Sequence, residues 1–174
     1  MTQSPELISV AYHEAGHAVM AALSPYHEVG ETVLAVEDLK VTTSNGRSHF
    51  LRLKDNDLWE FRIVVAGGAG EKLLDPNLDP WDVENLFAFK PSAAQLDIIT
   101  SGFTMDIDDD VDPEKYCRRE QRKIRAACEL LKKHAVAVHE VAKVLRTRGR
   151  ISGAEVQTIA GPVRKVRSTR EPKS

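Results

Sequence analysis

The chain has 174 residues, of which 42% are hydrophobic, and its formal net charge at pH 7 is −2. This composition suits one compact domain with a sizeable core and excludes a disulfide scaffold, because the two cysteines, Cys117 and Cys128, lie far apart. The longest apolar runs are far shorter than the roughly 20 residues of a membrane span, and no signal-peptide pattern opens the chain, so we expect a cytoplasmic protein.

The first predicted helix begins after Ser4 and ends at Ser24-Pro25. Ser4 is a typical N-cap residue, Pro5 suits the first helical position, and a Ser-Pro pair is a typical stop signal. Apolar residues at helical spacing predict its buried face: Ile8, Ala11, Ala15, Val19 and Ala22.

This helix carries the motif H-E-x-x-H, with His13, Glu14 and His17 at its fixed positions. Residues four apart lie on one face of a helix, so both imidazoles can reach one metal ion. Zinc suits two imidazoles and one further protein ligand, with a fourth position left for water. Glu14 lies beside the metal, where its carboxylate can accept a proton from that water. The motif therefore predicts hydrolysis of an amide bond.

A β-hairpin is predicted after this helix. Residues 31–41 are rich in β-branched side chains, Asn45-Gly46 is a strong turn signal, and Ser48 to Leu53 can form the returning strand. Such a hairpin can cover the core beside the first helix. It can also offer a strand edge to an extended substrate.

The second predicted helix runs from Leu58 to about Leu74, with Asp57 as its cap. Its interior holds three glycines, Gly67, Gly68 and Gly70. Glycines inside a helix are costly unless another helix packs closely against them, and the first helix, with Gly16 in its motif, is the expected partner.

Glu71 could be a third metal ligand, an acceptor for the second nitrogen of a ligand imidazole, or a surface residue. We favour the acceptor role because ligand histidines nearly always need one.

A third, short helix is predicted from Ser92 to about Phe103, and Asp97 stands alone among its apolar residues. The stretch before it is acidic and interrupted by prolines. We expect Trp81 to anchor that stretch to the core.

From Pro113 to about Arg146 the pattern is helical, with a break expected near His134 and an end at Gly149. Residues 152–155 form a capping-box sequence that opens one last short helix. The predicted buried stripe of this part consists of Ile124, Cys128, Leu131, Val136, Val138, Val141, Val144 and Leu145. We expect one domain over residues 1–160 and a basic disordered tail over 161–174.

Charge is distributed unevenly along the chain. Residues 1–112 contain 7 Lys or Arg against 20 Asp or Glu, whereas residues 113–174 contain 17 against 6. Such asymmetry can mark a nucleic-acid contact. It also arises when a basic helical layer packs against an acidic layer or faces solvent, and we favour this interpretation over a nucleic-acid partner.

The order of these parts resembles the peptidase domain of the FtsH-type ATP-dependent zinc metalloproteases. The resemblance rests on the sequence His13-Glu14-Ala15-Gly16-His17, on the glycine-rich helix 66–74, and on the C-terminal helical pair closed by residues 151–155. It covers most of the chain, from about Glu6 to Ile159. It implies a zinc peptidase whose third ligand is an aspartate on a helix after the glycine-rich one.

Asp97 is the nearest match to that aspartate, because Asp97-Ile98-Ile99-Thr100 is similar to the family pattern ending in Ala-Thr. Asp82 and Glu71 are competing candidates for the third ligand. The family's membrane segments and ATP-driven unfoldase do not fit in this chain, and no G-x-x-x-x-G-K-[ST] motif is present. We therefore expect a stand-alone peptidase that does not use ATP.

Together these features predict an α+β, mainly helical zinc metalloendopeptidase, in which the motif helix packs on a glycine-rich helix beside one β-hairpin and a C-terminal helical pair. Glu14 is the predicted catalytic base, and His13, His17 and Asp97 are the predicted Zn²⁺ ligands. The expected substrates are peptides or already unfolded segments, with no membrane partner, and a homo-oligomer is left open. The alternatives are a metal-binding or interaction module without catalysis, and a nucleic-acid contact through the basic C-terminal part.

Overall fold

The computed structural model describes residues 4–34, 46–81, 92–101 and 113–162. Its elements in chain order are α1 (Pro5–Leu23), β1 (His27–Leu34), β2 (Gly46–Arg52), α2 (Asp57–Leu74), α4 (Ala93–Thr100), α5 (Pro113–Lys133), α6 (Ala135–Arg148), β3 (Arg150–Ile151) and α7 (Gly153–Ala160). Helices dominate and one small antiparallel sheet accompanies them, which confirms the predicted α+β, mainly helical class. Of the predicted tail, residues 163–174 lie outside the described residues. No helix in the described part is long and apolar enough to cross a membrane.

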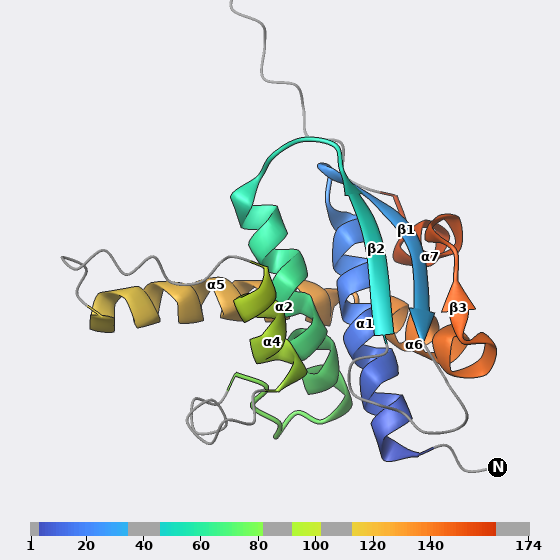
Figure 1. The fold of residues 1–174 in the computed structure, drawn as a ribbon, viewed down its shortest axis with the longest axis horizontal. Helices are drawn as coiled ribbons and strands as arrows, with labels where there is room; N and C mark the ends of the chain where they lie inside the picture. Colours follow the sequence, from blue (N-terminus) through green and yellow to red (C-terminus); the bar gives the residue numbers. More distant parts are fainter. Residues whose placement is uncertain (1–3, 35–45, 82–91, 102–112, 163–174) are drawn as a thin grey trace, which may run out of the picture.

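Helix α1 lies between α2 on one side and the sheet on the other (Figure 1). Its start is as predicted: the Ser4 side chain accepts a hydrogen bond from the backbone N–H of Leu7 at 3.3 Å, and Pro5 opens the helix. The helix ends at Leu23, with Ser24 as its C-cap. Its predicted apolar face is buried except for Ile8, which is partly buried.

The predicted hairpin is present, because β1 and β2 pair antiparallel, with Thr32 opposite Ser48 and His27 opposite Arg52. β1 begins at His27, earlier than expected, and its alternation of buried and exposed residues explains why this stretch is a strand. The predicted turn at Asn45-Gly46 lies partly outside the described residues. The two-residue strand β3, which we did not predict, pairs with the other edge of β1 and gives the strand order β2-β1-β3.

Helices α1 and α2 approach each other at glycines, as predicted. A Cβ atom built on Gly16 would overlap the backbone carbonyl of Ala66, and one built on Gly70 would overlap the carbonyl of Tyr12. The two glycines face each other, since a Cβ on Gly70 would lie 3.2 Å from the Cα of Gly16. Hydrogen atoms in place of side chains therefore let the two backbones touch and fix the position of one helix against the other.

The cap of α2 is Asn56 and not Asp57, so that prediction was wrong. The Asn56 side chain accepts a hydrogen bond from the Trp59 N–H at 3.1 Å, which leaves Asp57 as the first helical residue. Its carboxylate there is favourable with the helix dipole, which is why both residues fit the N-terminal signal.

The predicted C-terminal pair is present as α5 and α6, which are separated at His134. Gly149 ends α6 with a left-handed φ of 72°, and the Ser152–Glu155 capping box opens α7. Val136 was predicted to be buried but is 77% exposed. It lies five positions before the buried Val141, which places it on another face of the helix.

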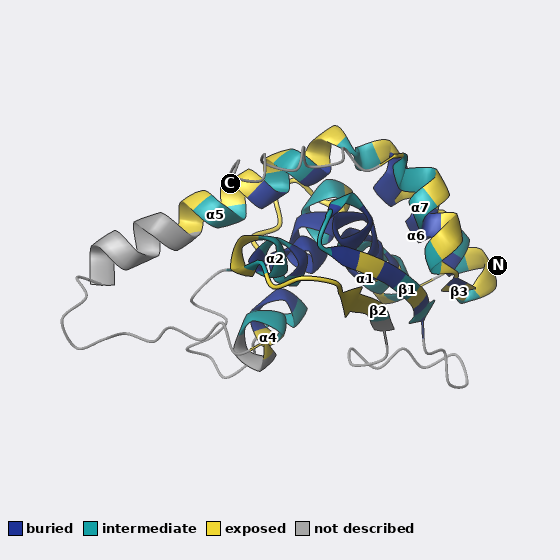
Figure 2. Cartoon of the chain, turned by 90° about the horizontal axis from the view of Figure 1, so that it is seen from above, coloured by how far each residue is buried: buried dark blue, intermediate teal, exposed yellow. Residues whose placement is uncertain are grey.

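The core lies where α1 meets α2, α6 and the sheet, and Figure 2 shows the buried residues concentrated there. Helix α4 attaches to α2 next to this core, because a Cβ on Gly68 would lie 2.7 Å from the Cβ of Ala94. Trp81 packs against the core as expected. The Ser92 hydroxyl donates a hydrogen bond to the Pro80 carbonyl and also caps α4. These contacts hold α4 beside α1 and α2.

Candidate metal centre

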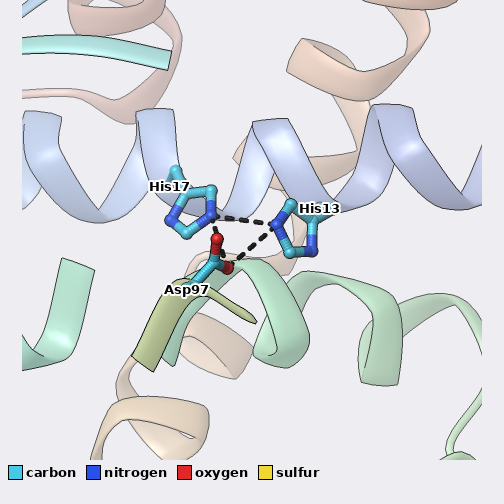
Figure 3. Close-up of side chains that lie close together, drawn as sticks. All are labelled: His13, His17 and Asp97. Carbon is cyan, nitrogen blue, oxygen red and sulfur yellow. Dashed lines mark hydrogen bonds and ion pairs between the residues drawn. The ribbon is translucent and has the colours of Figure 1, made fainter. Parts of the chain in front are cut away.

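The two histidines of the H-E-x-x-H motif point the same way from α1. The Nε2 atoms of His13 and His17 lie 3.1 Å apart, and their rings meet edge to face (Figure 3). This is the arrangement that one-turn spacing predicts for side chains on a helix. His13 is buried and His17 is partly buried.

The carboxylate of Asp97 comes from α4 and meets both histidines (Figure 3). Its Oδ2 atom lies 3.0 Å from His13 Nε2 and 3.2 Å from His17 Nε2. The three ligand atoms all lie within 4.8 Å of one another. Of the three candidates for the third ligand, Asp97 therefore shares a site with the histidine Nε2 atoms, and Asp82 lies outside the described residues. Coordination of a metal by these residues stays a prediction.

Glu71 occupies the position expected for an acceptor rather than a ligand. Its Oε1 atom lies 2.5 Å from His13 Nδ1, the nitrogen that faces away from Asp97. His17 Nδ1 likewise lies 2.7 Å from the backbone carbonyl of Ile63. A carbonyl can only accept, so His17 Nδ1 carries a hydrogen and donates it to Ile63. Nε2 is then the nitrogen of that ring which could bind a metal after losing its hydrogen. The Ile63 contact could not be predicted from the sequence, because every residue has a carbonyl.

Gly67 makes room for the imidazoles. A Cβ atom at this position would lie 2.5 Å from His13 Cε1 and 2.5 Å from His17 Nε2, well inside van der Waals contact. The sequence predicts contact with α1 for all three glycines of α2. In the structure Gly70 contacts the backbone of α1 and Gly67 contacts the imidazoles that α1 carries, whereas Gly68 faces α4.

The donor set fits a zinc ion. Two imidazole nitrogens and one carboxylate oxygen are typical of zinc sites that retain an open coordination position. Both imidazoles have a partner on Nδ1, which orients the rings and leaves Nε2 for a metal. The missing side chain of Gly67 also supports a metal site, because a Cβ atom there would lie 2.5 Å from His17 Nε2 and 2.6 Å from His13 Nε2.

The electrostatics of the site favour a positive charge at its centre. Burial disfavours a protonated imidazole, but the hydrogen bonds and negative charges of Asp97 and Glu71 outweigh it and raise the pKa of His13 to about 10. Burial also disfavours a charged Asp97, but its hydrogen bonds with His13 and His17 hold the pKa of that carboxyl well below its usual range. Both shifts come from carboxylates that converge on imidazoles, and a divalent cation would be stabilised by the same charges.

Glu14, the predicted base, is buried on α1 next to His13. Its Oε2 atom accepts a hydrogen bond from the Ser48 hydroxyl of β2 at 2.7 Å. The same hydroxyl lies 3.0 Å from the backbone carbonyl of Glu14. The sequence predicts Ser48 on the returning strand, but this contact could not be predicted because it depends on how the hairpin lies against α1.

No protein-family model matches the chain. A search of curated proteins finds the ATP-dependent zinc metalloprotease FtsH 2 of Sphaerobacter thermophilus, with 25% identity over 181 residues. The match covers 90% of this chain but only 27% of that protein, so the chain spans little more than a quarter of the relative's length. At this level of identity the match indicates a distant similarity to part of a zinc metalloprotease.

Proposed function

We propose that the chain is a zinc-dependent peptidase that hydrolyses peptide bonds in peptides or unfolded segments. The observation that carries this proposal is the meeting of His13 Nε2, His17 Nε2 and Asp97 Oδ2 next to a buried glutamate of the same helix. The distant match to a zinc metalloprotease supports it.

His13, His17 and Asp97 would hold the zinc ion, and Glu71 with the Ile63 carbonyl would keep the two imidazoles oriented. Zinc in such a site polarises a carbonyl and lowers the pKa of a water molecule to about 7. The protein's contribution to binding is a site already assembled from α1, α2 and α4, which costs little reorganisation when the ion arrives.

Glu14 moves the protons of the reaction. Its carboxylate accepts a proton from the attacking water, which makes the water a stronger nucleophile. It then donates that proton to the nitrogen of the leaving amine as the peptide bond breaks. Burial of the side chain and the Ser48 hydrogen bond keep the carboxylate in one place during both steps.

Strand β2 is the element best placed to bind an extended substrate. It stands at one end of the described sheet, and Ser48 connects it to Glu14. A peptide that pairs with the outer edge of β2 would be held by main-chain hydrogen bonds, which are independent of its sequence. We therefore propose extended, unfolded segments as the substrate class.

The test is hydrolysis of unfolded casein by the purified chain, before and after removal of metal with a chelator and again after zinc is restored. We expect activity that disappears with the chelator and returns with zinc. Zinc content measured on the same samples should approach one ion per chain. A protein that binds zinc but leaves casein intact would instead be a metal-binding module without catalysis.

The matched control is Glu14→Gln, which retains the size of the side chain and removes the base. It should retain zinc and lose at least about 10²-fold in rate. If Glu14→Gln hydrolyses casein as fast as the wild type, the activity comes from another group or from a contaminating protease.

A further inference from the structure

The carboxylate of Glu14 is enclosed by the protein and has one side-chain partner among the described residues. Glu14 is only 6% exposed, and the Ser48 hydroxyl donates to its Oε2 atom at 2.7 Å. Bulk solvent therefore reaches little of this residue, and a hydrogen bond from Ser48 compensates for part of the lost hydration. Hydrogen bonds to charged groups are roughly twice as strong as those between neutral groups.

Pairing within the sheet holds the backbone of Ser48 in place. Ser48 lies opposite Thr32 of β1, and Thr32 is fully buried and also pairs with Ile151 of β3. The hydroxyl lies 2.7 Å from the side-chain Oε2 and 3.0 Å from the main-chain carbonyl of Glu14. Its one hydrogen atom can be donated to either oxygen, and the contact with Oε2 is the shorter. Ser48 is therefore a donor on β2 that faces α1 at the residue following His13.

A general base acts efficiently only when its carboxylate is held in the productive orientation, because a misplacement of about 1 Å can lower the rate by about 10²-fold. A glutamate has three rotatable side-chain bonds, and burial alone leaves several of their combinations open. A donor anchored in a sheet removes that freedom for one of the two oxygens and leaves the other for chemistry.

We propose that Ser48 is the positioning residue of Glu14: it orients the general base, and does not itself touch substrate or metal. This inference rests on the proposed peptidase function. A purely structural role, in which Ser48 only attaches β2 to α1, predicts a loss of stability without a specific loss of catalysis.

The experiment compares Ser48→Ala, Ser48→Thr and Ser48→Val in the zinc-loaded protein. Threonine retains the hydroxyl and valine has the same shape without it, so this pair separates the hydrogen bond from packing. We expect kcat to fall about 10-fold or more in the alanine and valine variants, the effect of losing a hydrogen bond to a charged group, and the threonine variant to recover most of it. KM and zinc content should change little.

The second arm repeats Ser48→Ala in the Glu14→Gln background. If Ser48 acts through Glu14, the double variant should be no slower than Glu14→Gln alone. If Ser48→Ala lowers the rate equally in both backgrounds, or if it lowers only the melting temperature, the proposal is overturned.

A third readout does not need activity. In crystal structures of the metal-free wild type and Ser48→Val, the Glu14 carboxylate should hold one orientation in the first and several in the second. An unmoved carboxylate in Ser48→Val overturns the positioning role whatever the activity. An inactive wild type in which Glu14 is displaced by Ser48→Val would refute the peptidase proposal, and only the orientation of the Glu14 side chain by Ser48 would stand.

Discussion

At the scale of single residues, the candidate metal centre depends on which oxygen joins the two imidazoles. Asp97 Oδ2 meets both Nε2 atoms, whereas Glu71 Oε1 meets an Nδ1 atom on the far side of one ring. A carboxylate on the Nε2 side can share a metal with the rings. A carboxylate on the Nδ1 side can only orient one of them.

The first prediction follows from this difference. His17→Ala and Asp97→Ala should each lose most zinc, because two remaining ligands make a weak site, whereas Glu71→Ala should lose affinity by about 10–100-fold. Zinc affinity is measured by competition with a chromophoric chelator. Asp82→Ala serves as the comparison, and we expect it to bind zinc like the wild type. Wild-type affinity in Asp97→Ala would show that the third ligand is another residue.

The second prediction concerns the space beside the rings. Gly67→Ala adds a methyl group where His13 Cε1 and His17 Nε2 would lie 2.5 Å away, so the imidazoles must turn aside. Zinc affinity should fall strongly. The free energy of unfolding of the metal-free protein should fall less than it does in Gly70→Ala, because the methyl group at position 67 meets side chains and the one at position 70 meets backbone. The measurements are a zinc titration and urea unfolding of the metal-free protein. Undiminished zinc affinity in a folded Gly67→Ala protein would refute this role.

At the scale of elements, the glycine contact between α1 and α2 places the two histidines against the partners of their Nδ1 atoms. Both histidines are on α1, and both of their Nδ1 partners are on α2. A small shift of one helix along the other would therefore separate rings from partners. The close approach at Gly16 and Gly70 prevents such a shift, because the two backbones are in contact there.

The third prediction tests this contact. Gly70→Ala places a methyl group against the backbone carbonyl of Tyr12, which cannot move as a side chain can. We expect a loss of about 1–3 kcal/mol in the free energy of unfolding, or more, from overpacking. Urea unfolding of the metal-free protein measures it. The loss should exceed that of Gly67→Ala, and the reverse order would mean that the helix contact is less rigid than the backbone distances imply.

Helix ends and the motif could be predicted because their signals are local. Ser4, Gly149 and the capping box at Ser152 act within one turn of the chain, and the spacing of His13 and His17 determines their common face. The contacts between distant segments could not be predicted in this way. Strand β3 has only two residues and so no periodicity, and the Ser48 contact depends on how β2 lies against α1. Similarity to the family pattern favoured Asp97 as the third ligand over Asp82 and Glu71. The path of the chain brings Asp97 to the Nε2 atoms and Glu71 to an Nδ1 atom, whereas Asp82 lies outside the described residues.

At the scale of the whole molecule, another buried histidine links the pH of the solution to folding. His27 opens β1, and its Nδ1 atom lies 2.8 Å from the Ser24 hydroxyl oxygen. Its ring meets the Phe50 ring edge to face, and its buried Nε2 atom has no hydrogen-bond partner within the described structure. Burial lowers the pKa of His27 from its ordinary value of 6.5.

The fourth prediction is that His27 makes the protein less stable in acid. As the pH falls below about 6.5, His27 gains a proton in the unfolded chain before it does so in the folded one, which favours unfolding. The contribution of His27 to the free energy of unfolding is therefore fully present above about pH 6.5. It is lost as the pH falls through the lower pKa that His27 has in the folded protein. The measurement is urea unfolding between about pH 8 and pH 5 for wild type and His27→Gln.

The slope of unfolding free energy against pH should be smaller for His27→Gln, whatever its stability at neutral pH. His49→Gln is the matched control, because His49 lies on the same hairpin but is exposed. It should retain the wild-type slope. Equal slopes for wild type and His27→Gln would show that His27 titrates alike in folded and unfolded chains.

Because α1 and α4 supply the three predicted ligand atoms, a bound zinc ion would also affect the stability and the degradation of the protein. A metal shared by His17 and Asp97 would fasten together segments that lie far apart in the sequence, much as a chemical crosslink does. Zinc would then add to the free energy of folding as well as to catalysis, since a site that forms only on folding stabilises the native state by mass action. A shortage of zinc would then lower both the activity of the protein and its half-life, because other proteases degrade the unfolded chain.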